Sequence, residues 1–315
     1  MLARFYSASG DAQATTRCVV PARVLPAAVC HPKFTTPARG LPSVWQNPVS
    51  DHLFDIVADH ELGNRIVIDV DDPYFEGGEA WKEEDVEGHL EALQHAEVVL
   101  CTNAALAASY REFHDDVRVI PSCVDEQDFN LGRQMQHLDG KLRIGYAAGF
   151  THARDTELIA KALAIISATQ PEVVIEFIGA FDPGWDFAYK RYPALPYPAY
   201  KAMIATWHIG LAPLQPTALN ETRSDLKVLD YSMSGAACVA TPFGPYEHLA
   251  EKGLIATAES DDEWYEALLE LCENDGLRQR VALNAHHYCR VERHPANQRA
   301  AYLDALGLRR DRAHA

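Results

Sequence analysis

The sequence lacks the segments that would anchor a chain in a membrane or mark it for secretion. No stretch reaches the roughly 18 consecutive apolar residues that a membrane-spanning helix needs. The N-terminal residues do not combine a charged region with a long apolar run, which is the pattern of a secretory signal. We therefore expect a soluble cytoplasmic protein.

Cysteine is scarce and irregularly spaced. The seven cysteines are odd in number and none is paired as C-x-x-C, which predicts reduced thiols and no disulfide framework or zinc site. The chain also has no G-x-S-x-G sequence, so a hydrolase with that nucleophile elbow is excluded. The cysteines are Cys18, Cys30, Cys101, Cys123, Cys238, Cys272 and Cys289.

Positive charge is in short supply. The chain has 28 Lys and Arg against 45 Asp and Glu, which gives a formal net charge of −17. General affinity for a nucleic-acid backbone needs clustered cations, so this composition argues against it. A local exception precedes residue 40, where Asp11 is the sole acid among five basic residues: Arg4, Arg17, Arg23, Lys33 and Arg39.

The chain does have the length and the apolar content of two globular domains. It has 315 residues, of which 48% are hydrophobic and 23% charged. A chain of this length can bury roughly 75% of the surface that its unfolded form exposes. It needs neither a disulfide nor a metal ion to fold, and the usual domain size predicts about two domains.

Apolar runs alternate with amphipathic stretches twice along the chain. We predict strands at residues 2–6, 43–46, 65–70, 97–101 and 117–120, then a linker at 125–139, then strands at 142–147, 173–178, 209–212, 237–240 and 254–256. Helices are predicted at 16–29, 50–62, 84–95, 103–113, 155–169, 197–206, 227–234, 261–274, 275–288 and 295–306. This alternation predicts an α/β protein with parallel sheets covered on both faces.

The pattern divides the chain into a short first domain at residues 1–130 and a second domain at 131–290. Residues 291–315 are predicted to form a C-terminal helix that crosses back to the first domain. Ligands of such sheets lie at the carboxyl ends of the strands. The segments that follow strands are therefore the candidates for a functional site.

One such segment is IGYAAGFTHARD, residues 144–155. A strand runs into a loop of small residues and then into a helix with Thr151 or Asp155 as its N-cap. Backbone N–H groups at a helix start can hold an anion, Gly149 would let a phosphate approach the backbone closely, and Arg154 would add a cation. The alternative is an ordinary strand-to-helix turn with a surface arginine.

A second segment is NETRSDLKVLDY, residues 220–231. Lys227 and Asp230 are three residues apart at the start of a helix, so both project from one end of it. A cation there suits a diphosphate, and a carboxylate suits the hydroxyls of a ribose. The alternative is an ion pair on a solvated helix surface.

Residues 142–249 resemble the C-terminal domain of GT-B glycosyltransferases, in particular the retaining, nucleotide-sugar-dependent family 4-like enzymes related to sucrose and mannosyl transferases. The family pattern K-x-x-E-Y-x-x-x-G stands here as Lys227, Asp230, Tyr231 and Gly235. The resemblance implies the GT-B fold, two Rossmann-like domains with parallel sheets facing a central cleft. It implies a nucleoside diphosphate sugar as donor substrate and no other cofactor.

The resemblance also implies roles for individual residues. Lys227 and Arg154 would stabilise the leaving diphosphate, and Asp230 would bind the ribose. Further donor contacts are expected at six positions on the two segments, which would complete the donor site with Asp230: Gly149, Phe150, Thr151, Ser224, Asp225 and Leu226.

The sequence departs from the family at two positions. Asp230 replaces the usual glutamate, which shortens the carboxylate arm by one methylene. The first glutamate of the family signature falls at Thr222, with Glu221 beside it. These departures keep open the alternative of a catalytically weakened nucleotide-sugar binder or scaffold.

The first half of the chain resembles the family through RIVIDVDDP, residues 65–73. Asp71 stands where many relatives have a histidine that faces the sugar, and it is expected to line the sugar pocket. The alternatives are that Asp71 or Asp72 caps the loop before Pro73, or that Asp69, Asp71 and Asp72 bind a metal. We expect no metal, because the resemblance leaves neutralisation of the diphosphate to Lys, Arg and helix ends.

The acceptor is expected to bind mainly to the first domain. Gly10 stands where the family's first loop admits the acceptor, and Arg17 begins the next helix, where it would meet the acceptor or the donor phosphates; the alternative is a surface residue. The Val-Asp-Asp strand is similar to that of compact bacteriophage enzymes, which raises a modified base in phage DNA as an alternative to a glycan or small-molecule acceptor.

Overall fold

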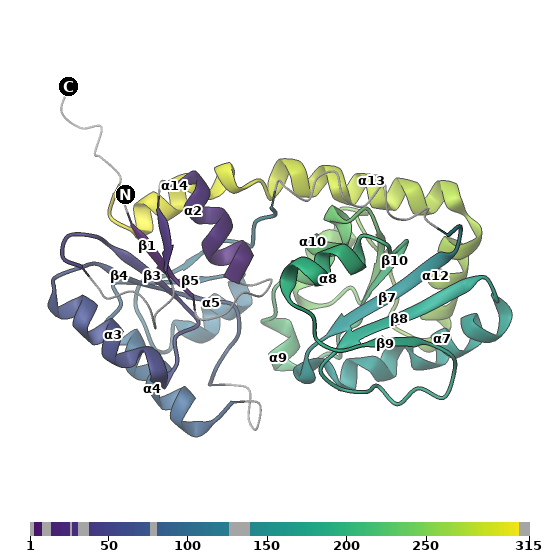
Figure 1. The fold of residues 1–315 in the computed structure, drawn as a ribbon, viewed down its shortest axis with the longest axis horizontal. Coiled ribbons are helices and arrows are strands. Elements are labelled where there is room, and N and C mark those ends of the chain that lie inside the picture. The colour runs from purple at the N-terminus through teal and green to yellow at the C-terminus, as the bar shows by residue number, and fades with distance from the viewer. Residues whose placement is uncertain are drawn as a thin grey trace. The chain divides into compact units, whose positions relative to one another are not determined.

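The computed structural model describes residues 3–7, 14–25, 27–30, 38–75, 81–125 and 139–308. The chain divides into two compact units, each built around its own parallel sheet (Figure 1). The first unit comprises Met1–Asp125, Glu221–Ser224 and Arg293–Ala315, and the second comprises Glu126–Asn220 and Asp225–Glu292. The predicted α/β class is confirmed.

In the described part of the first unit, six parallel strands form a sheet in the order β2-β1-β3-β4-β5-β6. The strands are β1 (Arg4–Tyr6), β2 (Ala28–Cys30), β3 (Ser43–Gln46), β4 (Ile66–Val70), β5 (Val98–Cys101) and β6 (Val117–Val119). The helices are η1 (Thr15–Val19), a π-helix that continues into α2 (Val20–Val24), then α3 (Ser50–Glu61), α4 (Glu83–Leu93), α5 (Ala104–Tyr110) and α14 (Pro295–Ala305).

Both faces of the first sheet are buried. Ile66, Ile68 and Val70 of β4 pack with residues of α3, α4 and α5, whereas Val67 packs with residues of α2 and α14. Because successive side chains of a strand point to opposite faces, an apolar run such as residues 66–68 reports a strand covered on both sides.

In the described part of the second unit, six parallel strands follow the order β12-β11-β10-β7-β8-β9. The strands are β7 (Leu142–Ala148), β8 (Val173–Gly179), β9 (Lys190–Tyr192), β10 (Ile209–Ala212), β11 (Ala237–Ala240) and β12 (Ala256–Thr257). The helices are η5 (Phe150–His152), η6 (Arg154–Thr156), α7 (Glu157–Thr169), α8 (Tyr197–Ile204), α9 (Ala218–Glu221), α10 (Leu226–Met233), η7 (Gly244–Tyr246), α11 (Glu247–Glu251), α12 (Asp261–Glu273) and α13 (Asp275–Glu292).

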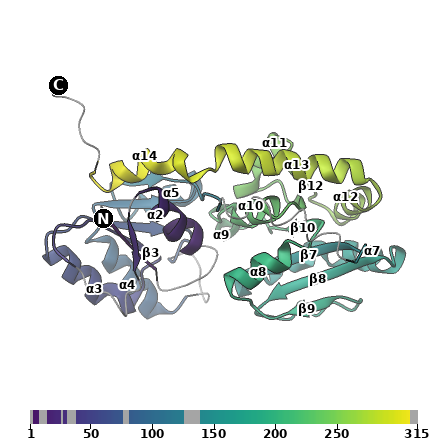
Figure 2. The same cartoon turned by 45° about the horizontal axis from the view of Figure 1, so that its top comes forward.

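The second sheet is also covered on both faces, by helices labelled in Figure 2. Val239 packs with residues of α7 and α12, and its neighbours Cys238 and Ala240 pack with residues of α8, α10 and α13. Two glycines admit large rings against this sheet. A Cβ on Gly145 would lie 2.0 Å from the Trp207 ring, and one on Gly210 would lie 2.4 Å from the Tyr231 ring.

Several elements differ from the sequence-based expectation. The helix expected at 16–29 ends at Val24, and residues 28–30 form β2 beside β1, because Pro26 cannot continue a helix. The Pro-rich stretch after Tyr189 contributes β9, which pairs with β8 through main-chain bonds that side-chain patterns do not report. The short helices α9 and α11 are not among the predicted elements, and the strand predicted at 254–256 is β12 at Ala256–Thr257.

Among the helices that the structure describes, none combines the length and the apolar character needed to cross a membrane.

His89 of α4 gives the first unit a pH-dependent stability. Its ring is buried, with Nδ1 2.7 Å from Pro48 O and Nε2 2.9 Å from the Tyr110 hydroxyl. Burial lowers the pKa of His89 to about 4, so the folded chain holds a neutral ring where the unfolded chain binds a proton below about pH 6.5.

Since the folded-state pKa is the lower one, this contribution is complete above about pH 6.5 and is lost as the pH falls toward 4. Between pH 6.5 and 4, His89 should lower the free energy of unfolding of the wild-type chain by up to about 3 kcal/mol. A His89→Gln variant should lack this decrease. Urea denaturation at pH 4 to 7.5 measures the difference, and parallel curves for the two proteins would contradict it.

Candidate functional site

The second unit brings two of the expected donor segments to one edge of its sheet. All its strand pairs are parallel, so β7, β8, β10 and β11 end at the same edge. The segment after β7 carries Gly149, and α10 carries Lys227 and Asp230. Lys227 Nζ donates a hydrogen bond to Ala147 O at 2.6 Å, which ties the start of α10 to the end of β7.

The turn after β7 differs in detail from the expected helix start. Two 3-10 turns, η5 and η6, precede α7, whose N-cap Thr156 makes no side-chain cap. The expectation that Thr151 or Asp155 caps this helix is wrong. Asp155 Oδ1 instead accepts hydrogen bonds from Gln215 N at 2.8 Å and Asn220 Nδ2 at 2.9 Å, so its carboxylate fastens the turn to the loop after β10.

Gly149 opens onto unfilled space. Its φ of −80° is available to any residue, and no described heavy atom lies within 4 Å of the place where a Cβ would stand. Neither strain nor packing against the described residues therefore requires a glycine there. The side chains of Phe150, Thr151 and Arg154 are exposed beside it, Phe150 to 68%.

Lys227 supplies a cation to this edge of the sheet. Its Nζ lies 4.8 Å from the centroid of the Tyr146 ring as well as beside Ala147 O. Ala147 N donates to the Tyr231 hydroxyl at 3.0 Å, so a second side chain of α10 holds the same peptide. Ala147, whose carbonyl oxygen accepts the hydrogen bond from the ammonium group, comes two residues before Gly149 in the chain.

Asp230 is engaged by a partner that sequence reasoning missed. Lys201 Nζ of α8 lies 3.1 Å from Asp230 Oδ1, and both side chains are more than nine-tenths buried. The Tyr197 hydroxyl donates to the same oxygen at 3.4 Å. Any ribose contact by Asp230 is therefore shared with Lys201.

Ser224, Asp225 and Leu226, which were expected to bind the donor, are divided between the two units. Asp225 precedes α10, and its Oδ2 lies 3.5 Å from His248 Nε2. Leu226 is the buried first residue of α10. Ser224 belongs to Glu221–Ser224, the short segment that groups with the first unit, as does Thr222 at the position of the missing glutamate.

Asp71 lies at the carboxyl edge of the first sheet, just after β4. Asn47 Nδ2, after β3, donates to Asp71 Oδ1 at 2.5 Å. Asn47 has φ 46°, in the left-handed region that asparagine tolerates better than most residues. Asp71 Oδ2 is buried and has no hydrogen-bond partner in the described part of the chain.

The environment of Asp71 favours its neutral form. Burial, and then the charge of Asp72, raise the pKa of Asp71 to about 8, so the carboxyl group carries a proton at neutral pH. A protonated carboxyl group donates a hydrogen bond, which suits a sugar hydroxyl and gives no electrostatic stabilisation to a positive charge.

Asp72 holds an arginine from far along the chain. Arg223 Nη1 donates to Asp72 Oδ1 at 2.5 Å, and both side chains are about nine-tenths buried. Asn103, the N-cap of α5, donates from Nδ2 to Thr222 O at 2.9 Å and to Arg223 O at 2.8 Å. These bonds fasten Glu221–Ser224 within the first unit.

Arg17, which was expected to meet the acceptor or the donor phosphates, is buried within the first unit. It is 1% exposed, and its Nε and Nη2 donate to the two oxygens of Asp69 at 2.8 and 2.6 Å. Its Nη1 donates to Ile120 O. Three of its five N–H groups are thus bonded inside the first unit. The alternative of a surface residue is wrong, and a contact of Arg17 with the acceptor or the donor phosphates stays a prediction. Gly10 lies outside the described residues.

The three aspartates of the D-x-D-D stretch point to different partners. Asp69 binds Arg17, Asp71 binds Asn47 and Asp72 binds Arg223. Asp69 lies within β4, whereas Asp71 and Asp72 follow its end. Over the described ranges, no three His, Cys, Asp or Glu side chains gather as metal ligands.

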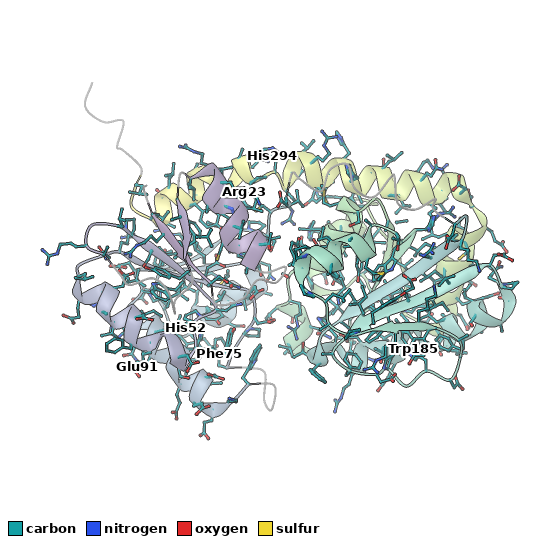
Figure 3. The ribbon with its side chains drawn as sticks, viewed as in Figure 1. Arg23, His52, Phe75, Glu91, Trp185 and His294 are labelled. Carbon is teal, nitrogen blue, oxygen red and sulfur yellow. The ribbon has the colours of Figure 1, made fainter. Side chains whose placement is uncertain are left out.

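Several of the basic residues that precede residue 40 are paired with acids in the structure. Arg4 is buried against Asp59 at 3.1 Å, and Arg17 against Asp69. Arg23, labelled in Figure 3, pairs with Asp125 at 2.7 Å. Acids from later in the sequence thus neutralise three of the five cations, and Lys33 lies outside the described residues.

Asn47, Lys201 and Arg223 were not singled out from the sequence. Asn47-Pro48 after a strand is a turn signal, and Arg223 stands beside the signature position at Thr222, so both had a weak signal. Lys201 had none, because its partner is 29 residues away.

Solved structures share this fold at low sequence identity. HepE of Anabaena, solved with UDP and glucose, is 12% identical with a TM-score of 0.68, and the match covers 98% of this chain and 99% of HepE. A UDP-forming α,α-trehalose-phosphate synthase of Burkholderia xenovorans is 13% identical with a TM-score of 0.61, covering 87% of this chain and 75% of the synthase. No protein-family model and no curated protein matches the sequence.

These likenesses show the fold. The chain has two Rossmann-like domains of the GT-B type, and the solved structures that it resembles are GT-B glycosyltransferases. The expected resemblance and fold class are confirmed.

The proton that Asp71 holds should make the stability of the folded chain depend on pH. The unfolded chain loses this proton near pH 4 and the folded chain near pH 8, so the Asp71 contribution to stability falls as the pH rises between these values. We expect Asp71→Asn to remove this decrease, which amounts to up to about 1.4 kcal/mol of unfolding free energy per pH unit. Denaturation of both proteins at pH 5 to 8 measures it, and identical slopes would contradict the assignment.

Proposed function

We propose that this protein is a glycosyltransferase that moves a sugar from a nucleoside diphosphate sugar to a hydroxyl group of an acceptor. The observation that carries the proposal is Lys227, an ammonium group tied to Ala147 O beside the open space at Gly149. It lies in a fold shared with proteins solved with UDP.

The donor side belongs to the second unit. In the reaction, the bond between the anomeric carbon and the phosphate oxygen breaks, and the acceptor oxygen takes its place on that carbon while its hydroxyl proton is released. Negative charge then builds up on the leaving diphosphate. Lys227 and the exposed Arg154 would stabilise this charge, which is the largest contribution that such a site makes, and no metal ion is needed.

The rest of the donor would follow the same edge of the sheet. The phosphates of the donor would approach the main chain at Gly149 and Thr151. The exposed ring of Phe150 would offer a stacking surface for the base. Asp230, together with Lys201, would bind the ribose hydroxyls. Ser224, Asp225 and Leu226 would bind the sugar and diphosphate, as the family resemblance implies.

Two further parts of the proposal, the contact of Asp71 with the transferred sugar and the stereochemistry, follow from the family resemblance. The neutral Asp71 carboxyl group would donate a hydrogen bond to a hydroxyl group of the transferred sugar from its unpartnered oxygen. Retention of the anomeric configuration follows the family.

Donor binding is the first test. At a ligand concentration 100 times the dissociation constant, binding adds about 2.7 kcal/mol to the stability of the folded chain. We expect UDP and UDP-glucose, or their GDP counterparts, to raise the thermal midpoint of the wild-type protein. A flat response to every nucleotide would overturn the proposal.

Turnover is the second test. Lys227→Ala removes the cation and should cost about 2–4 kcal/mol of transition-state stabilisation, the loss measured for one preorganised donor. The readout is release of free UDP and transfer of labelled sugar, repeated with a chelator present. Lys161→Ala is the matched control, since Lys161 is 59% exposed on α7.

Unchanged turnover in Lys227→Ala would contradict the assigned role. Nucleotide binding without any diphosphate release from the wild-type protein would instead support the nucleotide-sugar binder, which the substitutions at Thr222 and Asp230 keep as the second candidate.

A further inference from the structure

Arg223 has an unused binding edge. Its side chain is more than nine-tenths buried, and Nη1 is bound to Asp72. Within the described residues, its Nε and Nη2 are both buried and neither has a hydrogen-bond partner. Buried donors in proteins are nearly always bonded, so an unbonded pair of them needs an explanation.

Arg17 shows in the same unit what this edge of a guanidinium group binds. Its Nε and Nη2 donate side by side to the two oxygens of Asp69. This bidentate geometry matches carboxylate and phosphate groups. No other buried arginine in the described ranges has both of these nitrogens without a partner.

The edge of Arg223 is held in position before any ligand arrives. Asp72 binds the opposite side of the guanidinium group, and the Tyr110 hydroxyl lies 3.0 Å from Asp72 O. Asn103 fixes the main chain at Thr222 and Arg223. A donor pair fixed on both its side chain and its main chain loses little freedom on binding.

The nearby carboxyl group does not oppose an anion. Asp71 is adjacent to Asp72 in the chain, and its raised pKa keeps it protonated at neutral pH. Its Oδ2 is a second buried polar atom without a partner in the described part of the unit. The Asp72–Arg223 pair is itself neutral, so Asp71 adds no negative charge beside it.

We infer that the Nε–Nη2 edge of Arg223 binds an oxyanion, a carboxylate or a phosphate, carried by the acceptor. The inference rests on the proposed function, because it names the chemical class of the acceptor for that reaction. It assigns the oxyanion to the acceptor because Arg223 is fastened within the first unit. Of the proposed diphosphate contacts, Ser224 alone belongs to that unit, and the others belong to the second.

The test is binding to the full chain in the absence of any transfer reaction. Glucose 6-phosphate, glucuronate and glucose are titrated calorimetrically at one pH and one ionic strength, and UDP is titrated separately. We expect at least one of the two anionic sugars to bind about ten-fold or more tightly than glucose. Which of the two binds more tightly distinguishes a phosphate from a carboxylate.

Arg223→Lys keeps a cation for Asp72 but lacks the two-pronged edge. It should weaken binding of the preferred anionic sugar by about ten-fold or more and leave UDP binding unchanged. Arg111→Lys, an exposed arginine at the end of α5, is the matched control and should bind as the wild-type chain does. If Arg223→Lys does not fold, the Asp72→Asn, Arg223→Gln double variant replaces the buried ion pair by neutral groups, with the same expected loss.

Equal affinity of the wild-type chain for glucose and for both anionic sugars would overturn the inference. So would undiminished binding of the anionic sugar by Arg223→Lys, and an equal loss of UDP binding would assign the edge to the donor. If neither UDP nor GDP binds to the wild-type chain while the anionic sugar is still bound through Arg223, the proposed function is overturned and the oxyanion site is supported.

Discussion

Parallel pairing of the described strands is the constraint on which both candidate sites depend. A parallel pair needs a crossover long enough to return the chain to the same end of the sheet, and here helices make most of these returns. All strands of a sheet then end at one edge, where the loops are free to carry polar groups. Asn47 and Asp71 meet at that edge of the first sheet, and Ala147, Gly149 and Lys227 at that edge of the second.

The polar groups at these edges differ in how well they are satisfied. In the second unit, the described bonds of Asp155 and Asp230 fasten loops and helices to one another. In the first unit, Asp71 Oδ2 and two nitrogens of Arg223 are buried without partners among the described residues. Such atoms lower the stability of a folded chain, and functional sites are where proteins retain this kind of cost.

Much of the architecture follows from local sequence. Runs such as 66–68 and 98–100 report buried strands, and the pattern around Lys227, Tyr231 and Gly235 carried the family resemblance. The expectations that proved wrong depend on distant partners. Arg17 reads as a surface residue until Asp69 is known to face it, and Asp155 reads as a helix cap until Gln215 and Asn220 claim its carboxylate.

The sequence by itself determined the α/β class, the alternation of strands and helices, and the position of Lys227 at a helix start, because these depend on periodicity and short spacings. Only the tertiary structure decided the partners of the buried charges. Asp72 and Arg223 are separated by 151 residues, and Lys201 reaches Asp230 from another helix. A buried charge must find a partner wherever the fold brings one close, and that proximity is a property of the packed chain.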